Sequence, residues 1–306
     1  MNSNISTDRP ASGSSPNKSA WQISARLQDP CHLDVFHPGG ARWNAKIVDI
    51  TQIINKIPYR LALSGGWIDQ PFVSRNNPSP PGSMVVVGVQ PDFRFMDRCG
   101  MGTSTRQVAA RLWNGTLPQR DPAEMVQELY AAENEGLAEP SGSQDMAGLI
   151  YPGVNRLDYD HNYSGGIFPV RIESNTDSQT AAWLENVMHI LPVAPRPAGY
   201  NPFGNENLAP EWVQRLGQSG KACYTAIEQR DSSALGEAMN ECMRCWEAIL
   251  PRTVRHPLLT LDLMELLAFY QHRYAGAMYS GCGGGYLYIV SEQPVPGSFQ
   301  IRVRLE

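Results

Sequence analysis

A glycine-rich run in the first half of the chain is followed directly by a helix-type sequence. The run is Cys99-Gly100-Met101-Gly102-Thr103-Ser104-Thr105, and helical spacing continues from its end to Trp113. A loop that opens a helix gathers free backbone N–H groups and the positive end of the helix dipole at one point, where an anion such as phosphate binds. Most runs of this composition are plain turns and N-caps, so the run alone is weak evidence for a phosphate site.

Two carboxylates lie close to the ends of predicted helices. The sequence predicts a helix over 122–135, with Asp121 as its N-cap and Pro122 at its first position. Glu133 lies in the last turn of that helix, and Asp145 lies at the start of the next helix. Taken singly, Glu133 fits a solvated helix face and Asp145 fits a first-turn acid that the helix dipole favours. Neither acid alone indicates a site.

Two further glycine turns flank this region of the chain. Residues 59–63 alternate with the period of a strand and stop at Ser64-Gly65-Gly66-Trp67-Ile68-Asp69. At such a turn the backbone can approach a ligand and the aspartate can bind hydroxyls, although a hairpin turn with an Asx cap is the alternative. Near the C-terminus, Ser280-Gly281-Cys282-Gly283-Gly284-Gly285 separates a predicted helix from a predicted strand. This third run is at minimum a tight turn.

Composition excludes several classes of function. The chain has 306 residues, which is long enough to bury a large core in one large domain or in two. Its net charge is −5, which is mild. No lysine- or arginine-rich run is present and the pI is about 5.7, so a nucleic-acid partner is not expected. No apolar run approaches the roughly 18 residues of a membrane span, so no membrane partner is expected. Residues 1–20 are rich in Ser, Asn and Pro and predict a disordered tail rather than a signal peptide.

The six cysteines are scattered through the chain, which favours reduced thiols and a cytoplasmic location. Cys242 and Cys245 form a C-x-x-C within a helical pattern, but no second pair or nearby histidine completes a zinc site. Core packing is therefore the favoured interpretation of these two thiols. The six histidines form no pair with metal-ligand spacing.

The remaining patterns predict the elements that must position these residues. The apolar run at 82–89 predicts a central strand. A loop rich in proline, glycine and asparagine lies at 195–204, and loops of this length are often functional. The other predicted strands lie at 21–36, 43–54 (after a turn at 37–40), 59–63, 154–159, 166–172, 190–191 and 297–305. The predicted helices cover 105–113, 122–135, 210–229, 233–250 and 257–274, the last ending at Gly276.

In this order, the three glycine turns and the two acids between the second and third resemble the motifs of the GHMP kinase superfamily. The similarity is strongest to its heptose-phosphate and fucose kinase branch, and it runs from about Ile57 to Val290. Pro58 to Pro71 resembles the first motif, and Gly100 to Thr105 resembles the phosphate loop. Tyr130-Ala-Ala-Glu133 and Gly142-Ser-Gln-Asp145 resemble the two acidic motifs of the branch, and Ser280 to Tyr286 resembles the third motif with one glycine fewer.

The resemblance implies an α+β fold with two lobes and an active site in the cleft between them. It places a mixed α/β lobe at 21–170 and a lobe of helices on a sheet at 171–306, after the tail at 1–20. The implied reaction is ATP-dependent transfer of the γ-phosphoryl group to a hydroxyl of a sugar or sugar phosphate, of the heptose or fucose kind. ATP and Mg²⁺ are the implied cofactors.

The resemblance also implies a role for each matched residue. Asp145 is the base that takes the proton of the attacking hydroxyl, and Arg60 steadies Asp145. Glu133 and Ser104 bind Mg²⁺. The nucleotide is bound by the phosphate loop, namely Gly100, Met101, Gly102, Thr103, Ser104 and Thr105. The substrate is bound by Asp69 and by glycines of the first and third turns, namely Gly65, Gly66, Gly281, Gly283 and Gly284.

One departure from the family pattern supports a second hypothesis. Only about thirty positions separate Asp69 from Gly100, where the family has several tens more, including segments that help to hold adenine. The alternative is therefore a non-catalytic protein with the same fold, a sensor or scaffold with a degraded adenine pocket. A weaker third option is ATP-dependent decarboxylation. Trp67 stands where the family has a small residue and would narrow or reshape the sugar pocket. The expected partner is a small-molecule substrate, and a homodimer is compatible with the sequence.

Overall fold

The computed structural model describes residues 32–36, 42–46, 56–92, 94–137 and 140–306. The chain divides into two compact units, Met1–Asp49 and Ile50–Glu306. In the first unit, β1 (His32–Phe36) pairs antiparallel with β2 (Arg42–Lys46), and both overlap the strands predicted there. The predicted tail at 1–20 and the predicted turn at 37–40 lie outside the described residues.

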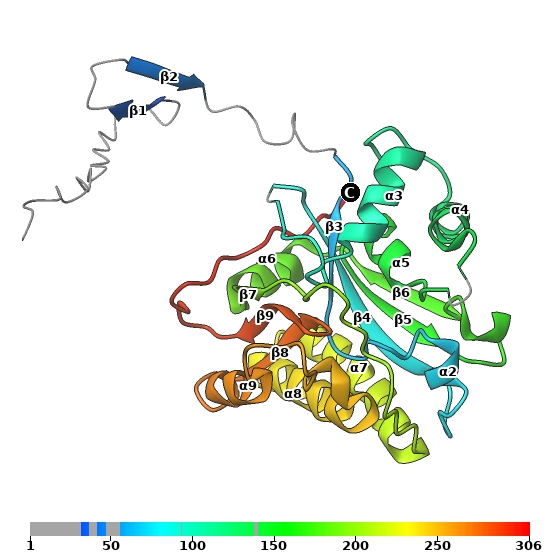
Figure 1. Ribbon diagram of the computed structural model, residues 1–306. Coiled ribbons are helices and arrows are strands. Elements are labelled where there is room, and N and C mark those ends of the chain that lie inside the picture. The colour runs from blue at the N-terminus through cyan, green and yellow to red at the C-terminus, as the bar shows by residue number, and fades with distance from the viewer. Residues whose placement is uncertain (1–31, 37–41, 47–55, 93, 138–139) are drawn as a thin grey trace, which may run out of the picture. The chain divides into compact units, whose positions relative to one another are not determined.

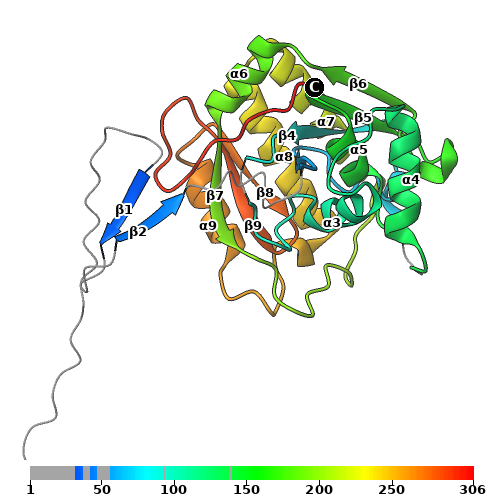
Figure 2. The same cartoon turned by 90° about the horizontal axis from the view of Figure 1, so that it is seen from above.

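The second unit begins with a four-stranded antiparallel sheet in the order β3-β4-β5-β6 (Figure 1). Its strands are β3 (Tyr59–Ala62), β4 (Gly82–Val89), β5 (Val154–Tyr159) and β6 (Arg171–Asn175). All 8 residues of β4 are buried because this strand lies inside the sheet and is covered on both faces, as its apolar sequence predicts. α5 (Gln144–Ile150) lies on one face of the sheet and α7 (Pro210–Gln229) lies on the other (Figures 1 and 2).

Local sequence explains where the helices of this first sheet begin. α4 (Pro122–Asn134) begins at Asp121, whose carboxylate accepts hydrogen bonds from the first backbone N–H groups of the helix. α3 (Thr103–Leu112) begins two residues earlier than predicted, because Gly102 takes the left-handed conformation of its N-cap at φ 66°. The short α2 (Pro71–Ser74) follows the first glycine turn, and α6 (Ser178–Val187) follows β6.

The prediction of a strand at 166–172 is wrong. Ser164–Gly166 forms a 3₁₀ turn, η1, in which Gly165 and Gly166 have φ of 62° and 79°. Left-handed backbone cannot continue a ladder, so pairing starts only at Arg171, at the beginning of β6.

The second sheet has three antiparallel strands in the order β7-β9-β8. Its strands are β7 (Met188–Ala194), β8 (Gly276–Gly281) and β9 (Gly284–Val290). α8 (Ser232–Ile249) and α9 (Leu263–Gln271) pack against β8 and β9, and the 3₁₀ turn η2 (Pro251–Thr253) follows α8. Two sheets with their own helices confirm the predicted α+β fold class; the predicted lobe boundary at 170/171 stays a prediction.

Two predictions near the C-terminus are wrong. α9 begins at Leu263 rather than at 257, because the carboxylate of the N-cap Asp262 accepts hydrogen bonds from the backbone N–H groups of the two residues after Leu263. Gly276 opens β8 instead of ending the helix. The segment 297–305 is not a strand: among described residues its backbone pairs with the sheets only in the isolated bridges Val89↔Val303 and Ile190↔Phe299.

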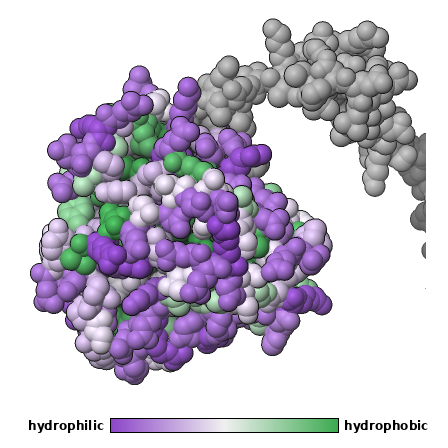
Figure 3. Space-filling model, turned by 180° about the vertical axis from the view of Figure 1, so that it is seen from behind, coloured by the Kyte–Doolittle hydropathy of each residue, from purple (hydrophilic) through white to green (hydrophobic). Residues whose placement is uncertain are grey.

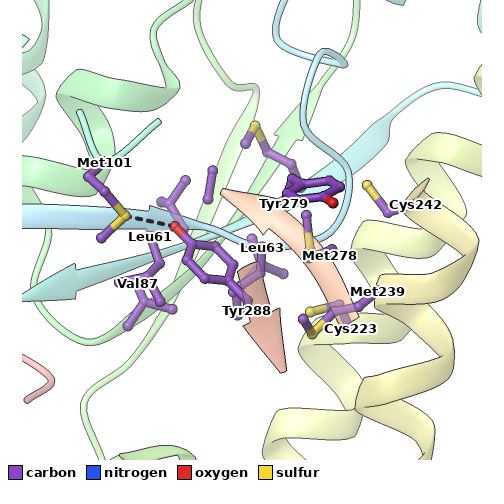
Figure 4. Close-up of a cluster of buried hydrophobic side chains, with 14 of the residues drawn as sticks. Leu61, Leu63, Val87, Met101, Cys223, Met239, Cys242, Met278, Tyr279 and Tyr288 are labelled. Carbon is purple, nitrogen blue, oxygen red and sulfur yellow. Dashed lines mark hydrogen bonds between the residues drawn. The ribbon is translucent and has the colours of Figure 1, made fainter. Parts of the chain in front are cut away.

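One apolar core joins the two sheets (Figure 4). Leu61 and Val87 of the first sheet face Tyr288 of the second, and the thiols of Cys223 and Cys242 reach the same cluster from α7 and α8. The five described cysteines are free and buried, which confirms core packing for the C-x-x-C pair. Seen from behind, the surface is mostly hydrophilic, with apolar residues in small groups (Figure 3). No helix within the described residues is long and apolar enough to cross a bilayer.

Candidate active site

The phosphate-loop sequence and the third glycine turn meet in space. A Cβ atom on Gly281 would lie 2.8 Å from the Cα atom of Gly100, and one on Gly100 would lie 2.3 Å from the carbonyl oxygen of Ser280. Gly100 also has φ 72°, which only glycine adopts readily. Ser280 Oγ donates to the carbonyl oxygen of Cys99, which ties the two turns together. The phosphate loop and the third glycine turn, about 180 positions apart in the chain, are therefore in direct contact.

A cavity of about 170 Å³ opens beside this junction. Its walls come from both sheets and their helices, and they carry two arginines, one carboxylate, two glutamines and two indoles. The lining residues are Arg60, Ala62, Gly66, Trp67, Gln70, Gly100, Ser141, Gly142, Gln144, Asp145, Arg196, Trp246, Ser280, Gly281 and Cys282.

Arg60 on β3 joins the candidate base to the phosphate loop. Its Nε donates to Asp145 Oδ1 at 2.8 Å, its Nη2 donates to the same oxygen, and its Nη1 donates to the carbonyl oxygen of Gly100 at 2.6 Å. Arg60 is buried because α5 approaches β3 at a glycine: a Cβ atom on Gly148 would lie 2.8 Å from the Arg60 Cβ. The planar guanidinium can serve both partners at once, which an ammonium on a flexible stem does not do.

Thr105 links the two acids that the resemblance singled out. Its hydroxyl lies 3.0 Å from Glu133 Oε1 and 3.4 Å from Asp145 Oδ2, so it can donate to either carboxylate. Thr105 is buried whereas Ser104, the predicted Mg²⁺ ligand of this loop, is exposed. Burial raises the pKa of Glu133 to about 7; the Thr105 hydrogen bond opposes this shift, and the charge of Asp145 adds to it.

The residues around Thr105 fit a divalent cation that is shared with phosphates. Glu133 Oε2 is buried and has no hydrogen-bond partner within the described residues, an arrangement that a positive charge would relieve. In the same part of the chain, no three histidine, cysteine or carboxylate side chains converge on one point. Mg²⁺ bound with substrate phosphates needs only one or two protein carboxylates, so this donor set suits Mg²⁺ rather than a metal held by protein alone.

Asp69 lies behind the cavity wall. It is fully buried and does not line the cavity, and a Cβ atom on Gly142, which does, would lie 1.8 Å from Asp69 Oδ2. Neither carboxylate oxygen has a hydrogen-bond partner among the described residues. Burial raises the pKa of Asp69 to about 7, and the negative charge of Asp145 adds to the shift. The predicted contact of Asp69 with substrate hydroxyls therefore requires Gly142 to move.

The predicted site residues fall into two groups in space. Those that line the cavity are Arg60, Gly66, Gly100, Asp145 and Gly281. Those that do not are Gly65, Asp69, Met101, Gly102, Thr103, Ser104, Thr105, Glu133, Gly283 and Gly284. Met101 points into the core, where the Tyr288 hydroxyl donates to its sulfur (Figure 4). The binding roles of both groups stay predictions.

Several lining residues were not predicted as site residues. They are Gln70, Gln144, Arg196 and Trp246, which reach the cavity from four separate segments. Gln70 and Gln144 lie within the first motif and the second acidic motif, and the loop at 195–204 was noted for its length, but no role was assigned to these residues. Arg106, which follows the phosphate loop, donates from Nε to the carbonyl oxygen of Ile57 at 2.8 Å and is not a lining residue.

Comparison with known proteins gives a likeness in structure alone. No family profile matches the sequence, and no curated protein matches it significantly. A mevalonate kinase structure is similar with a TM-score of 0.54 and 12% identity over 82% of this chain and 99% of that one. A D-glycero-D-manno-heptose 1-phosphate kinase from Bacteroides thetaiotaomicron gives 0.51 and 13% over 82% and 96%. A galactokinase from Lactococcus lactis, complexed with galactose, gives 0.53 and 12% over 78% and 85%.

These similarities extend through nearly the whole length of each solved kinase, so they describe the entire fold and not one motif. At identities of 12–13%, a similar structure shows that the fold is shared and does not show a shared activity. The chain has the fold of the GHMP kinases.

Proposed function

We propose that this protein is a small-molecule kinase that transfers the γ-phosphoryl group of ATP to a hydroxyl of a sugar or sugar phosphate. The observation that carries the proposal is the position of Arg60, which binds Asp145 with one edge and the phosphate loop at Gly100 with another. Phosphoryl transfer depends on positioning and charge neutralisation rather than on covalent help from the protein. Arg60 supplies both at the point where a base and a phosphate site adjoin.

Asp145 is the proposed base. It is half-buried at the cavity wall, and its hydrogen bond and ion pair with Arg60 hold it where it can accept a proton from the attacking hydroxyl. Arg60 orients the carboxylate and lies beside the loop where negative charge would move during transfer.

Glu133 and Thr105 are the proposed cation side of the site. Bound there with the nucleotide, Mg²⁺ would neutralise charge on the phosphates. Glu133 provides the carboxylate. The Thr105 hydroxyl, which lies between Glu133 and Asp145, holds the Glu133 carboxylate in its orientation. Backbone N–H groups at the start of α3 are the proposed donors to the phosphates, because the first turn of a helix leaves its donors unpaired.

The acceptor side of the cavity suits a polyol. Gln70 and Gln144 provide carboxamides, and Gln144 Oε1 is buried with no hydrogen-bond partner within the described chain. Trp67 and Trp246 provide apolar surfaces. A mixture of apolar walls with a few oriented polar groups is typical of small-molecule sites.

A transfer assay tests the proposal. The purified chain is incubated with MgATP and a panel of neutral and phosphorylated sugars, including fucose and heptose phosphates, and new phosphomonoesters are detected by phosphorus NMR. We expect a product with wild type and a rate of formation at least about 100-fold lower with Asp145→Asn. Asp121→Asn is the matched control, because it removes the same charge at an exposed N-cap where asparagine caps equally well.

A non-catalytic protein with this fold is the second candidate. It is favoured by the small cavity, in which Gly100 is the single lining residue from the loop 100–105. Calorimetry with ATP and Mg²⁺ separates the two candidates: the kinase proposal expects clear micromolar binding, and the second candidate expects none. A cytoplasmic location, a homodimer and separate lobes on either side of residue 170 remain predictions from the sequence.

A further inference from the structure

Arg196 is a cavity-lining cation that is not used by the proposed transfer step. Within the described residues, no carboxylate lies within ion-pair distance of its guanidinium. Its one side-chain hydrogen bond there runs from Nε to the carbonyl oxygen of Arg98 at 3.3 Å. The two terminal nitrogens, which form the fork that binds phosphate oxygens, are left for a ligand. The other lining arginine, Arg60, is already bound to Asp145 and Gly100.

The loop that carries Arg196 is held in place at several points. The Arg196 N–H donates to the carbonyl oxygen of Arg98 at 3.2 Å, and the Arg98 guanidinium donates to the carbonyl oxygen of Pro197. Tyr200 donates to the carbonyl oxygen of Arg252 at 2.7 Å. The stem of Arg196 lies on the third glycine turn, since a Cβ atom on Gly283 would lie 2.9 Å from Arg196 Cγ. The cation is therefore positioned before any ligand arrives, which lowers the entropic cost of binding.

The far end of the same loop packs against an indole that lines the cavity. Phe203 packs edge to face with Trp67 at 5.9 Å and with Phe72 at 5.8 Å between ring centroids, and Trp67 and Phe72 are 6.3 Å apart. Trp67 holds the unusual φ of 84° within the first glycine turn and lines the cavity. One loop thus provides the cation and packs against the indole that faces the same space.

Arg196 lies on the acceptor side of the phosphate loop. The cavity includes the proposed base Asp145, but Met101 to Thr105 do not line it. An anion bound by Arg196 in this cavity therefore shares space with the hydroxyl to be phosphorylated. Asp145 keeps its own counter-ion in Arg60, so the free charge of the cavity is that of Arg196.

From this arrangement we infer that Arg196 binds a phosphate group already present on the acceptor, so that the substrate is a sugar phosphate and not a neutral sugar. Naming this ligand the acceptor rests on the proposed kinase function; the anion subsite does not. Gln70 and Gln144 then meet the hydroxyls of the sugar, and Trp67 covers its apolar face.

Calorimetric titration without nucleotide tests the subsite independently of turnover. The full chain is titrated with mannose, mannose-1-phosphate, mannose-6-phosphate and inorganic phosphate, in wild type, Arg196→Gln and Arg94→Gln. Arg94 is exposed and does not line the cavity, so its variant controls for the loss of one positive charge. We expect at least one phosphorylated sugar to bind wild type and Arg94→Gln about 10–100-fold more tightly than mannose, and Arg196→Gln to remove that difference.

Three results would overturn the inference. They are equal binding of mannose and its phosphates by wild type, binding of a phosphate that Arg196→Gln leaves unchanged, and no binding of any phosphorylated probe. ATP is titrated in parallel to assign the anion: a loss confined to ATP in Arg196→Gln would place the bound phosphate on the nucleotide and contradict the inference. Arg196-dependent binding without phosphoryl transfer would instead contradict the kinase function and leave the subsite standing.

Discussion

Arg60 Nε donates to Asp145 Oδ1 at 2.8 Å, although the two residues are 85 positions apart in the chain. Arg60 lies within β3, the edge strand of the first sheet, and Asp145 lies in the first turn of α5. Because Arg60 is buried, the distance between the candidate base and the phosphate loop is set by the fold and not by a mobile side chain. This geometry leads to the first prediction.

Arg60→Lys lowers kcat by about 100-fold, because a single ammonium cannot hold Asp145 and the Gly100 carbonyl in their present geometry. Steady-state kinetics with the best acceptor measures the effect. Arg156→Lys is the control: Arg156 pairs with Asp158 at 3.0 Å on the same sheet and does not line the cavity. It is expected to lower stability without a comparable loss of kcat. Wild-type kcat in Arg60→Lys would contradict the positioning role.

Thr105→Val raises the pKa of Glu133 further above about 7, because the Thr105 hydrogen bond favours the charged carboxylate. A protonated carboxyl is a poor Mg²⁺ ligand, so the acidic limb of the pH–rate profile moves to higher pH and more Mg²⁺ is needed for half-saturation. Thr105→Ser keeps the hydroxyl and should restore both. A Thr105→Val profile that overlays wild type would show that Glu133 does not bind the cation.

Gly100→Ala destabilises the fold by more than the conformational cost of about 1–2 kcal/mol for a residue in the left-handed region. The added Cβ atom would also lie 2.3 Å from the carbonyl oxygen of Ser280. Gly199→Ala is a close control, since Gly199 has φ 73° and nothing within 4 Å of its Cβ position. Urea unfolding of both variants separates strain from contact. Equal losses would mean that the two glycine turns do not pack as described.

Asp69→Asn stabilises the protein more at pH 8 than at pH 5. Burial raises the pKa of Asp69 from 3.8 to about 7, so between these values the folded chain holds a proton that the unfolded chain releases. Stability from this group is fully present below about pH 4 and is lost progressively as the pH rises to about 7, by about 1–4 kcal/mol in total. Thermal or urea unfolding at both pH values measures the difference, with the exposed Asp92→Asn as the charge control. A gain for Asp69→Asn that is the same at both pH values would exclude titration of Asp69 as its cause.

Much of the fold follows from local sequence. β5 and α7 have the predicted bounds, and α4 begins where Asp121 and Pro122 predict, because strand alternation, apolar faces and caps are local signals. The segment 297–305 looked like a strand because its alternation is real. Its pairing depends on which strand edges are already occupied, and that is not a local property.

The site was harder to predict than the fold. α3 starts at Thr103 and not at the predicted Thr105, and successive residues of a helix point about 100° apart around its axis. In this helix the Thr105 side chain faces the two acids, whereas the Ser104 side chain is exposed. The burial of Asp69 depends on Gly142, a residue some seventy positions away. Arg196 carries no motif because a single arginine in a proline-rich loop acquires meaning only when the loop is anchored beside the cavity.

The central claim is that Asp145, held by Arg60 beside the phosphate loop, makes this chain a kinase. The most direct measurement is the rate of γ-phosphoryl transfer from MgATP to the best sugar-phosphate acceptor in wild type, Asp145→Asn and Asp121→Asn. We predict transfer by wild type and Asp121→Asn, and a fall of about 10²–10⁴-fold in kcat for Asp145→Asn with ATP binding retained. Equal rates in wild type and Asp145→Asn, or no transfer to any acceptor by a wild-type protein that binds no ATP, would contradict the claim.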